Sequence, residues 1–170
     1  APAAVPTSAS NVTIPASVVS SNWPVFAGNV TLNSINMISG SQVDVNGFSL
    51  TLNSVGAYNY FTGATLNNSN GVTDIVINVN TGGGGFVTYF RSNIVNDAVI
   101  FNITGTNQFL EGNTSPSNQY NGNVSFNIND VLPVYISYIS PSQYNGNLTV
   151  SRTVAGGTSM FNAGGTVTGN

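Results

Sequence analysis

Five carboxylates and two guanidinium groups carry the side-chain charge of this sequence of 170 residues, which has no histidine, cysteine or lysine. The acidic residues are Asp44, Asp74, Asp97, Glu111 and Asp130. Two carboxylates roughly 5–9 Å apart can cleave a glycosidic bond, but the sequence gives no reason to pair any two of these five. Asp44, Asp97 and Asp130 lie beside predicted turns, where aspartate commonly accepts hydrogen bonds from local backbone. We therefore predict that the chain is not an enzyme and binds no cofactor.

The scarcity of charge argues against several other kinds of site. Only 4% of the residues are charged, against roughly 25% in an ordinary globular domain. Arg91 and Arg152 cannot form the basic stripe that nucleic acid requires, and zinc or thiol chemistry needs His or Cys. The sequence holds no Asp-x-Asp motif of the kind that binds calcium. Its 27 Asn, 20 Ser and 17 Thr instead predict a neutral, polar surface that is prone to association.

Seven Asn-x-Ser/Thr sequons are candidate sites of N-glycosylation. Five of them place an aliphatic residue in the middle, so that in a strand both polar side chains share the outer face. We interpret the sequons as glycosylated, because glycans would solubilise a surface without charge. The alternative is that they are ordinary outward polar positions. The asparagines are Asn11, Asn29, Asn67, Asn102, Asn113, Asn123 and Asn147.

A short aromatic cluster, Tyr58, Tyr60 and Phe61, suits either of two roles. Sugar-binding modules stack such rings on saccharides, whereas most aromatic residues fill the core. The core is the favoured interpretation, and a carbohydrate-binding module is the alternative.

From Trp23 onward the sequence predicts short β-strands separated by turns, and no segment shows an amphipathic helical stripe. The clearest turn is Asn46-Gly47, which suits a type I′ hairpin because both central residues of that turn need positive φ. Many short strands of this kind are typical of a sandwich or barrel. We predict a single domain over residues 23–170.

One internal similarity is visible in the sequence. The segment Ser115–Phe126 matches Ser140–Val150 with one residue deleted. Two copies are fewer than the three or more repeats that a solenoid needs, so we interpret them as two similar turns leading into strands. A short β-solenoid, suggested by stretches such as Val43–Leu52, is disfavoured because the spacing of the turns is irregular.

Residues 1–22 differ from the rest because they hold three of the seven prolines and no aromatic residue. Apolar residues alternate here at Val12, Ile14, Ala16 and Val18, which predicts a strand. This strand is either the first of the sheet or an arm that pairs with another molecule. The start lacks the basic and apolar regions of a signal peptide. We therefore expect a mature chain from which any signal peptide has been removed, located outside the cell or at its surface and without a membrane span.

These features together resemble the subunits of thread filaments of the archaeal Sulfolobales and, more loosely, bacterial chaperone–usher type 1 pilins. The resemblance is carried by the Ala1-Pro2-Ala3 start, the alternating tail Val12/Ile14/Ala16/Val18, the scattered sequons and the scarcity of charge. It implies donor-strand complementation between identical subunits and heavy N-glycosylation. It also implies a hot, acidic habitat.

We accordingly expect an all-β, immunoglobulin-like and pilin-like β-sandwich over residues 23–170, preceded by a donor-strand arm and hinge over residues 1–22. The expected function is that of a structural subunit of an extracellular filament that polymerises head to tail and serves adhesion or cell–cell contact. Its partners would be identical subunits and covalent N-glycans. The alternatives are a carbohydrate-binding module and a virion jelly-roll coat protein.

Overall fold

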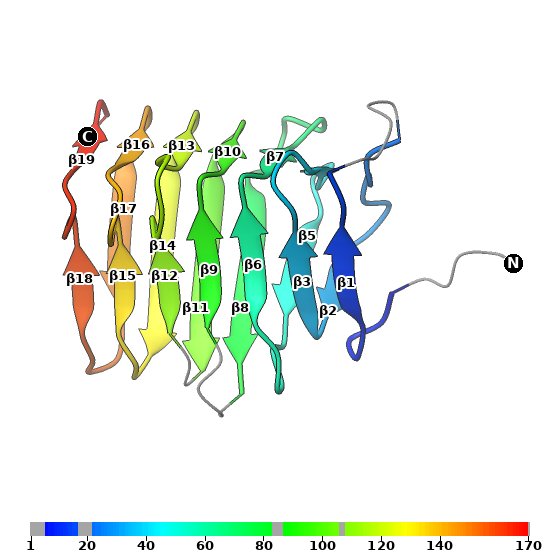
Figure 1. The fold of residues 1–170 in the computed structure, drawn as a ribbon, viewed down its shortest axis with the longest axis horizontal. Helices are drawn as coiled ribbons and strands as arrows, with labels where there is room; N and C mark the ends of the chain where they lie inside the picture. The colour runs from blue at the N-terminus through cyan, green and yellow to red at the C-terminus, as the bar shows by residue number, and fades with distance from the viewer. Residues whose placement is uncertain (1–5, 17–21, 83–86, 106–107, 170) are drawn as a thin grey trace, which may run out of the picture.

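A computed structural model describes residues 6–16, 22–82, 87–105 and 108–169, and over these ranges the chain forms nineteen strands and no helix. The strands wind into a parallel β-solenoid of about 6 turns, stacked side by side along one axis (Figure 1). The N-terminal strands β1 and β2 lie at one end of the stack, and the C-terminal strands β18 and β19 lie at the other. Since these ranges hold no helix, they hold none that could cross a membrane.

Each complete turn contributes one strand to each of three sheets, and every pairing is parallel; the first turn lacks a strand in sheet B and the last lacks one in sheet C. Sheet A contains β1 (Asn11–Ile14), β3 (Ser34–Met37), β6 (Asn59–Thr62), β9 (Thr88–Arg91), β12 (Phe109–Glu111), β15 (Val134–Ile136) and β18 (Thr158–Met160). Sheet B contains β4 (Gln42–Asp44), β7 (Thr65–Asn67), β10 (Ile94–Val95), β13 (Gln119–Tyr120), β16 (Ser142–Tyr144) and β19 (Gly165–Val167). Sheet C contains β2 (Val30–Leu32), β5 (Ser49–Leu52), β8 (Ile75–Thr81), β11 (Val99–Gly105), β14 (Val124–Asp130) and β17 (Leu148–Arg152).

The predicted immunoglobulin-like sandwich is therefore wrong, and the jelly-roll alternative fails with it. The Asn46-Gly47 turn shows the physical reason. Both residues have the positive φ that was expected, 48° and 80°, but β4 and β5 on either side lie in different sheets. The same turn chemistry can close a hairpin or turn a corner, and here each strand pairs with the strand one turn away.

The internal similarity marks two successive turns of the solenoid. Tyr120 pairs with Tyr144, and Phe126 pairs with Val150. The solenoid was disfavoured because the spacing of the turns is irregular, and the turn lengths do vary. The stretch of chain from Leu50 to its partner Ile77 is longer than the stretch from Ile77 to its next partner, Phe101. Corner loops absorb these differences, so the strands remain in register.

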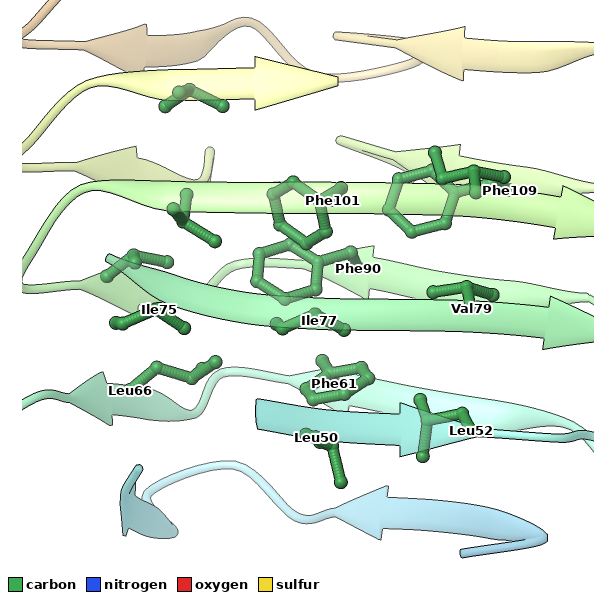
Figure 2. Packing of buried hydrophobic residues seen from close by; sticks show 14 of the residues in the cluster. Leu50, Leu52, Phe61, Leu66, Ile75, Ile77, Val79, Phe90, Phe101 and Phe109 are labelled. Carbon is green, nitrogen blue, oxygen red and sulfur yellow. The ribbon is translucent and has the colours of Figure 1, made fainter. Parts of the chain in front are cut away.

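Inward side chains form columns along the axis, one residue from each turn. In sheet C, Leu50, Ile77, Phe101 and Phe126 are consecutive partners in one such column and are all buried. Figure 2 shows Leu50, Ile77 and Phe101 of three successive turns packed between the strands. Phe101 and Phe126 stack with ring centroids 5.0 Å apart. Burial of each such side chain stabilises the fold by about 1.5–3 kcal/mol. The period-2 alternation predicted from the sequence therefore supplies the side chains of the core.

The predicted donor strand is the first strand of sheet A. β1 pairs in parallel with β3 of the same chain, with Ile14 opposite Met37. Ile14 is buried, Val12 is half-buried and Ala16 is exposed, while Val18 lies outside the described residues. β1 ends before Pro15, which has no N–H to donate to a ladder. The expected arm that leaves its own subunit without a strand is thus corrected, because this segment closes its own solenoid.

Candidate functional site

The N-terminal end of the solenoid carries an apolar hollow of about 580 Å³. Its walls come from β1, the segment before β2, and β2 itself, and they include Val12, Ile14, Phe26, Val30 and Leu32. In the described residues no turn lies over these strands, so their outer sheet edges are unpaired; Val12, Phe26 and Val30 are half-buried, whereas Ile14 and Leu32 are buried.

The segment around Val25 places part of this first turn beside sheet B. The Phe26 N–H donates to the Asp44 carbonyl (2.9 Å) and the Asp44 N–H donates to the Pro24 carbonyl (2.9 Å), so that Val25 forms a parallel bridge with Asp44. The Val25 side chain is 59% exposed. The N-terminal end therefore offers an edge in each of the three sheets.

The C-terminal end exposes the last members of the interior columns. Met160 pairs with the fully buried Ile136, and Val167 pairs with the fully buried Tyr144. Met160 is nevertheless 41% exposed and Val167 is 37% exposed. Both occupy core positions that lack a covering turn within the described chain.

Arg152 fixes the shape of this C-terminal end. It pairs with Ile128 at the end of an interior column in sheet C. Its guanidinium group donates to the carbonyls of Val154 (3.1 Å) and Gly157 (2.8 Å) and to Thr158 Oγ1 (2.9 Å). It also donates to the carbonyls of Asp130 and Leu132. The Arg152 guanidinium is therefore bonded within its own subunit, where it holds the loop between β17 and β18.

Glu111 is buried among several hydrogen-bond donors. Its Oε1 accepts from Asn118 Nδ2 (2.5 Å), Ser142 Oγ (2.5 Å) and Tyr120 Oη (3.1 Å). Its Oε2 accepts from the Ser137 N–H (2.6 Å) and Tyr144 Oη (3.1 Å). Burial raises the pKa of Glu111, and these hydrogen bonds oppose that shift. The group is fully buried, so its arrangement is that of a structural centre and not of an accessible acid catalyst.

The other acidic residues are spread along the solenoid. The predicted bonding of three of them to local backbone is confirmed. Asp44 accepts from the Asn46 N–H, Asp97 from the Ala98 N–H and Asp130 from the Leu132 N–H. Burial raises the pKa of Asp44, but hydrogen bonds from Ser69 and Asn46 outweigh it and lower the pKa overall.

The sequon asparagines differ in their surroundings. Asn11, Asn29, Asn123 and Asn147 are exposed, whereas Asn67, Asn102 and Asn113 are half-buried. Asn102 stands in a ladder of side-chain amides on the outer face of sheet C. Its Nδ2 donates to Asn78 Oδ1 (2.9 Å) and its Oδ1 accepts from Asn127 Nδ2 (2.9 Å). Asn67 Oδ1 accepts from Asn96 Nδ2 (2.8 Å) in a second ladder.

The second ladder continues from Asn96 through Asn121 to Asn145, with amide hydrogen bonds of 2.9 and 3.0 Å. Sequence reasoning missed both ladders. The available signal was the recurrence of asparagine at the spacing of the internal similarity, which places Asn121 and Asn145 at matching positions.

The predicted aromatic cluster is divided between the two faces of sheet A. Phe61 points inward and is fully buried, as expected of a core residue. Tyr60 points outward and stacks on Tyr89, and Tyr58 is 41% exposed. The assignment of the whole cluster to the core is thus correct for Phe61 alone.

No family model, curated protein or solved structure matches this chain. The likeness to thread subunits and pilins therefore remains one of composition and sequence arrangement, and the observed solenoid differs from the sandwich that it implied.

Proposed function

We propose that this chain is the structural subunit of an extracellular filament, in which the C-terminal turn of one copy stacks on the N-terminal turn of the next. The observation that supports this most directly is that all three parallel sheets end in unpaired edges at both ends of the described solenoid. Unpaired edges are templates for pairing with another chain.

The polarity of the strands suits such a junction. β18 and β1 are the two edge strands of sheet A, and β17 and β2 are those of sheet C. In sheet B, β19 would face the segment around Val25. All strands in a sheet run the same way, so head-to-tail stacking continues the parallel pairing. An interface between two different surfaces of one subunit produces an open polymer unless the rotation between successive subunits closes a ring.

The two ends of the solenoid also both carry apolar side chains that can cover each other. Met160 and Val167 would enter the apolar region at the N-terminal end, and each could contribute about 1.5–3 kcal/mol when covered. Backbone hydrogen bonds between β18 and β1 and between β19 and the segment around Val25 would add roughly 1 kcal/mol each, whereas the last described turn contributes no strand to sheet C. Donor-strand exchange is not part of this proposal, because β1 already pairs with β3 in its own chain.

The neutral surface supports assembly outside the cell. With a formal net charge of −3 over 170 residues, like-charge repulsion between copies is weak. Exposed sequons at Asn11, Asn29, Asn123 and Asn147 could carry glycans that keep the sides of the filament apart. N-glycosylation and an extracellular location belong to the proposal.

Cysteine cross-linking tests the junction directly, because the chain has no cysteine of its own. Val25 pairs with Asp44, and Thr168 follows Val167 at the other end of sheet B, so both side chains face outward. Neighbouring strands lie about 4.8 Å apart, within the Cα separation that a disulfide accepts.

A mixture of Val25→Cys and Thr168→Cys proteins should form a disulfide-linked dimer, and negative-stain images of the unmodified chain should show filaments one solenoid wide. The matched control mixes Thr168→Cys with Val72→Cys, because Val72 is 84% exposed on a lateral loop. Equal cross-linking in both mixtures, or none in the first, would disprove end-to-end stacking.

A further inference from the structure

The two arginines of this chain are used in different ways. Arg152 donates five hydrogen bonds to its own subunit. Arg91 donates one, from Nε to Thr62 Oγ1 (3.1 Å), and its terminal nitrogens bond to none of the described residues. Since a guanidinium group stays protonated in proteins, Arg91 places a permanent cation on the outer face of sheet A.

Two tyrosines form a wall beside this cation. Tyr60 and Tyr89 are in-register partners whose rings lie 5.3 Å apart and within 3° of parallel. The Arg91 guanidinium carbon lies 5.2 Å from the Tyr89 ring centroid and 5.8 Å from that of Tyr60. Each ring covers one face of the other, so a ligand that reaches Arg91 beside the stack would meet the ring edges and hydroxyl groups.

Those groups favour one kind of ligand. The edge of an aromatic ring carries partial positive charge, a phenol donates a hydrogen bond, and a guanidinium binds a carboxylate with two parallel bonds. All three attract a negatively charged oxygen. A neutral sugar cannot stack between Tyr60 and Tyr89, because those two ring faces already stack on each other.

The neighbouring residues extend the surface along the solenoid axis. Thr13, Asn36, Tyr60 and Tyr89 pair in sequence, so their outward side chains form one row. Each carries a hydroxyl or amide group, and the spacing between them is about 4.8 Å. The backbone beneath is already bonded within sheet A, so an extended peptide could not add to it as a strand.

From these observations we propose that the outer face of sheet A binds a carboxylate-bearing polysaccharide, with Arg91 holding the carboxylate and the row from Thr13 to Tyr89 holding hydroxyl groups. This goes beyond the proposed filament, since it assigns a lateral binding face instead of an end. Binding depends on a single cation in a chain of net charge −3, so it is expected to weaken as salt rises.

Affinity electrophoresis or titration calorimetry at low salt can test this with four polymers: polygalacturonate, its fully methyl-esterified form, dextran and poly-glutamate. Polygalacturonate should bind, and Arg91→Gln should weaken its binding about tenfold, as expected for loss of a charged hydrogen bond. Tyr89→Leu should also weaken it. The matched control is Gln143→Ala, an exposed outward residue of sheet B, which should bind normally.

Each variant removes an outward group, so its melting temperature should stay close to that of the parent and show that the fold is intact. Unchanged binding by Arg91→Gln would overturn the proposal, as would equal binding of the methyl ester or dextran. Equal binding of poly-glutamate would show recognition of acidic peptide in place of polysaccharide. Filament images of Arg91→Gln should match those of the parent, so failure of this site and failure of end-to-end assembly are distinguishable.

Discussion

Tyr120 and Tyr144 stack with ring centroids 5.0 Å apart and planes within 4° of parallel, and both hydroxyls donate to the same carboxylate, that of Glu111. Burial raises the pKa of both phenols, and the Glu111 charge raises both pKa values further. The phenols therefore stay protonated and act as donors. One buried charge thus organises side chains from two successive turns.

Glu111 should make the protein more stable in acid than at neutral pH. Burial raises the pKa of Glu111 in the folded state above the ordinary value of 4.5. At pH values between the unfolded and the folded pKa, the folded state therefore binds more protons than the unfolded state. Stability should then be greatest below about pH 4 and fall as pH rises towards the folded pKa. Asp44 has a lowered pKa and acts in the opposite sense as pH falls, but it is half-exposed and its effect is screened.

Thermal melts between about pH 3 and 8 measure this dependence. Glu111→Gln should flatten it and also destabilise the fold by about 1–3 kcal/mol, because Asn118 Nδ2 would then meet an amide group or lose its acceptor. The control is Asp74→Asn, which alters an exposed carboxylate. A parent protein that becomes steadily more stable from pH 4 to 8 would contradict the assignment.

Buried and exposed asparagines should respond very differently to truncation. Asn118 accepts from the Asn93 N–H (2.9 Å) and donates to the Phe90 carbonyl (3.0 Å), all within the core. Asn118→Ala leaves the buried Asn93 N–H without its acceptor and removes one donor to Glu111, and it should cost about 1–3 kcal/mol in urea denaturation. Asn121→Ala, on the exposed ladder, should change stability by about 0.5 kcal/mol or less. Equal losses would show that burial does not decide the effect.

Glycan occupancy should follow exposure. We expect at least four of the sequons to be occupied in a glycosylating host, including Asn29, Asn123 and Asn147, which are exposed. Asn102 should stay unmodified, because its amide nitrogen already donates to Asn78 and a glycan there would crowd the ladder. Glycopeptide mass spectrometry measures each site. Occupied Asn102, or an intact mass near the bare 17.6 kDa, would contradict this.

Ile14 should matter for folding of the single subunit. Its side chain is 6% exposed and lies against Met37 in the core, so Ile14→Asp buries an unpaired carboxylate and should cost several kcal/mol. Ala16→Asp places the same charge on an exposed residue and should cost little. Denaturant unfolding of monomers compares the two. An unaffected Ile14→Asp monomer would favour a detachable arm over a first strand.

Local structure was largely predictable from the sequence, because it depends on neighbouring residues. Alternation predicted that Ile103 and Val124 point inward while the sequon residues beside them point outward. Ile103 and Val124 are indeed buried. The positive φ of Asn46 and Gly47 was predictable for the same reason. The partner of each strand was not predictable, since the same turn can form either a hairpin or a corner and does not specify which.

The candidate sites were less accessible to sequence reasoning. Glu111 resembles any other acidic residue until Ser142 and Tyr144 arrive from the following turn. The apolar hollow and the exposed Met160 and Val167 depend on which strands are left at the ends of a stack. Such features are properties of long-range pairing, which alternation and composition do not encode.

The unequal lengths of the turns have a consequence for folding. If all turns were interchangeable, a nascent chain could skip one and continue in a shifted winding of almost equal energy. Here a shift by one turn would take Glu111 away from Asn118 and Ser142, and would set loops of the wrong length at each corner. The irregularity that hides the repeat from a reader of the sequence therefore gives the chain a single order in which its turns can be stacked.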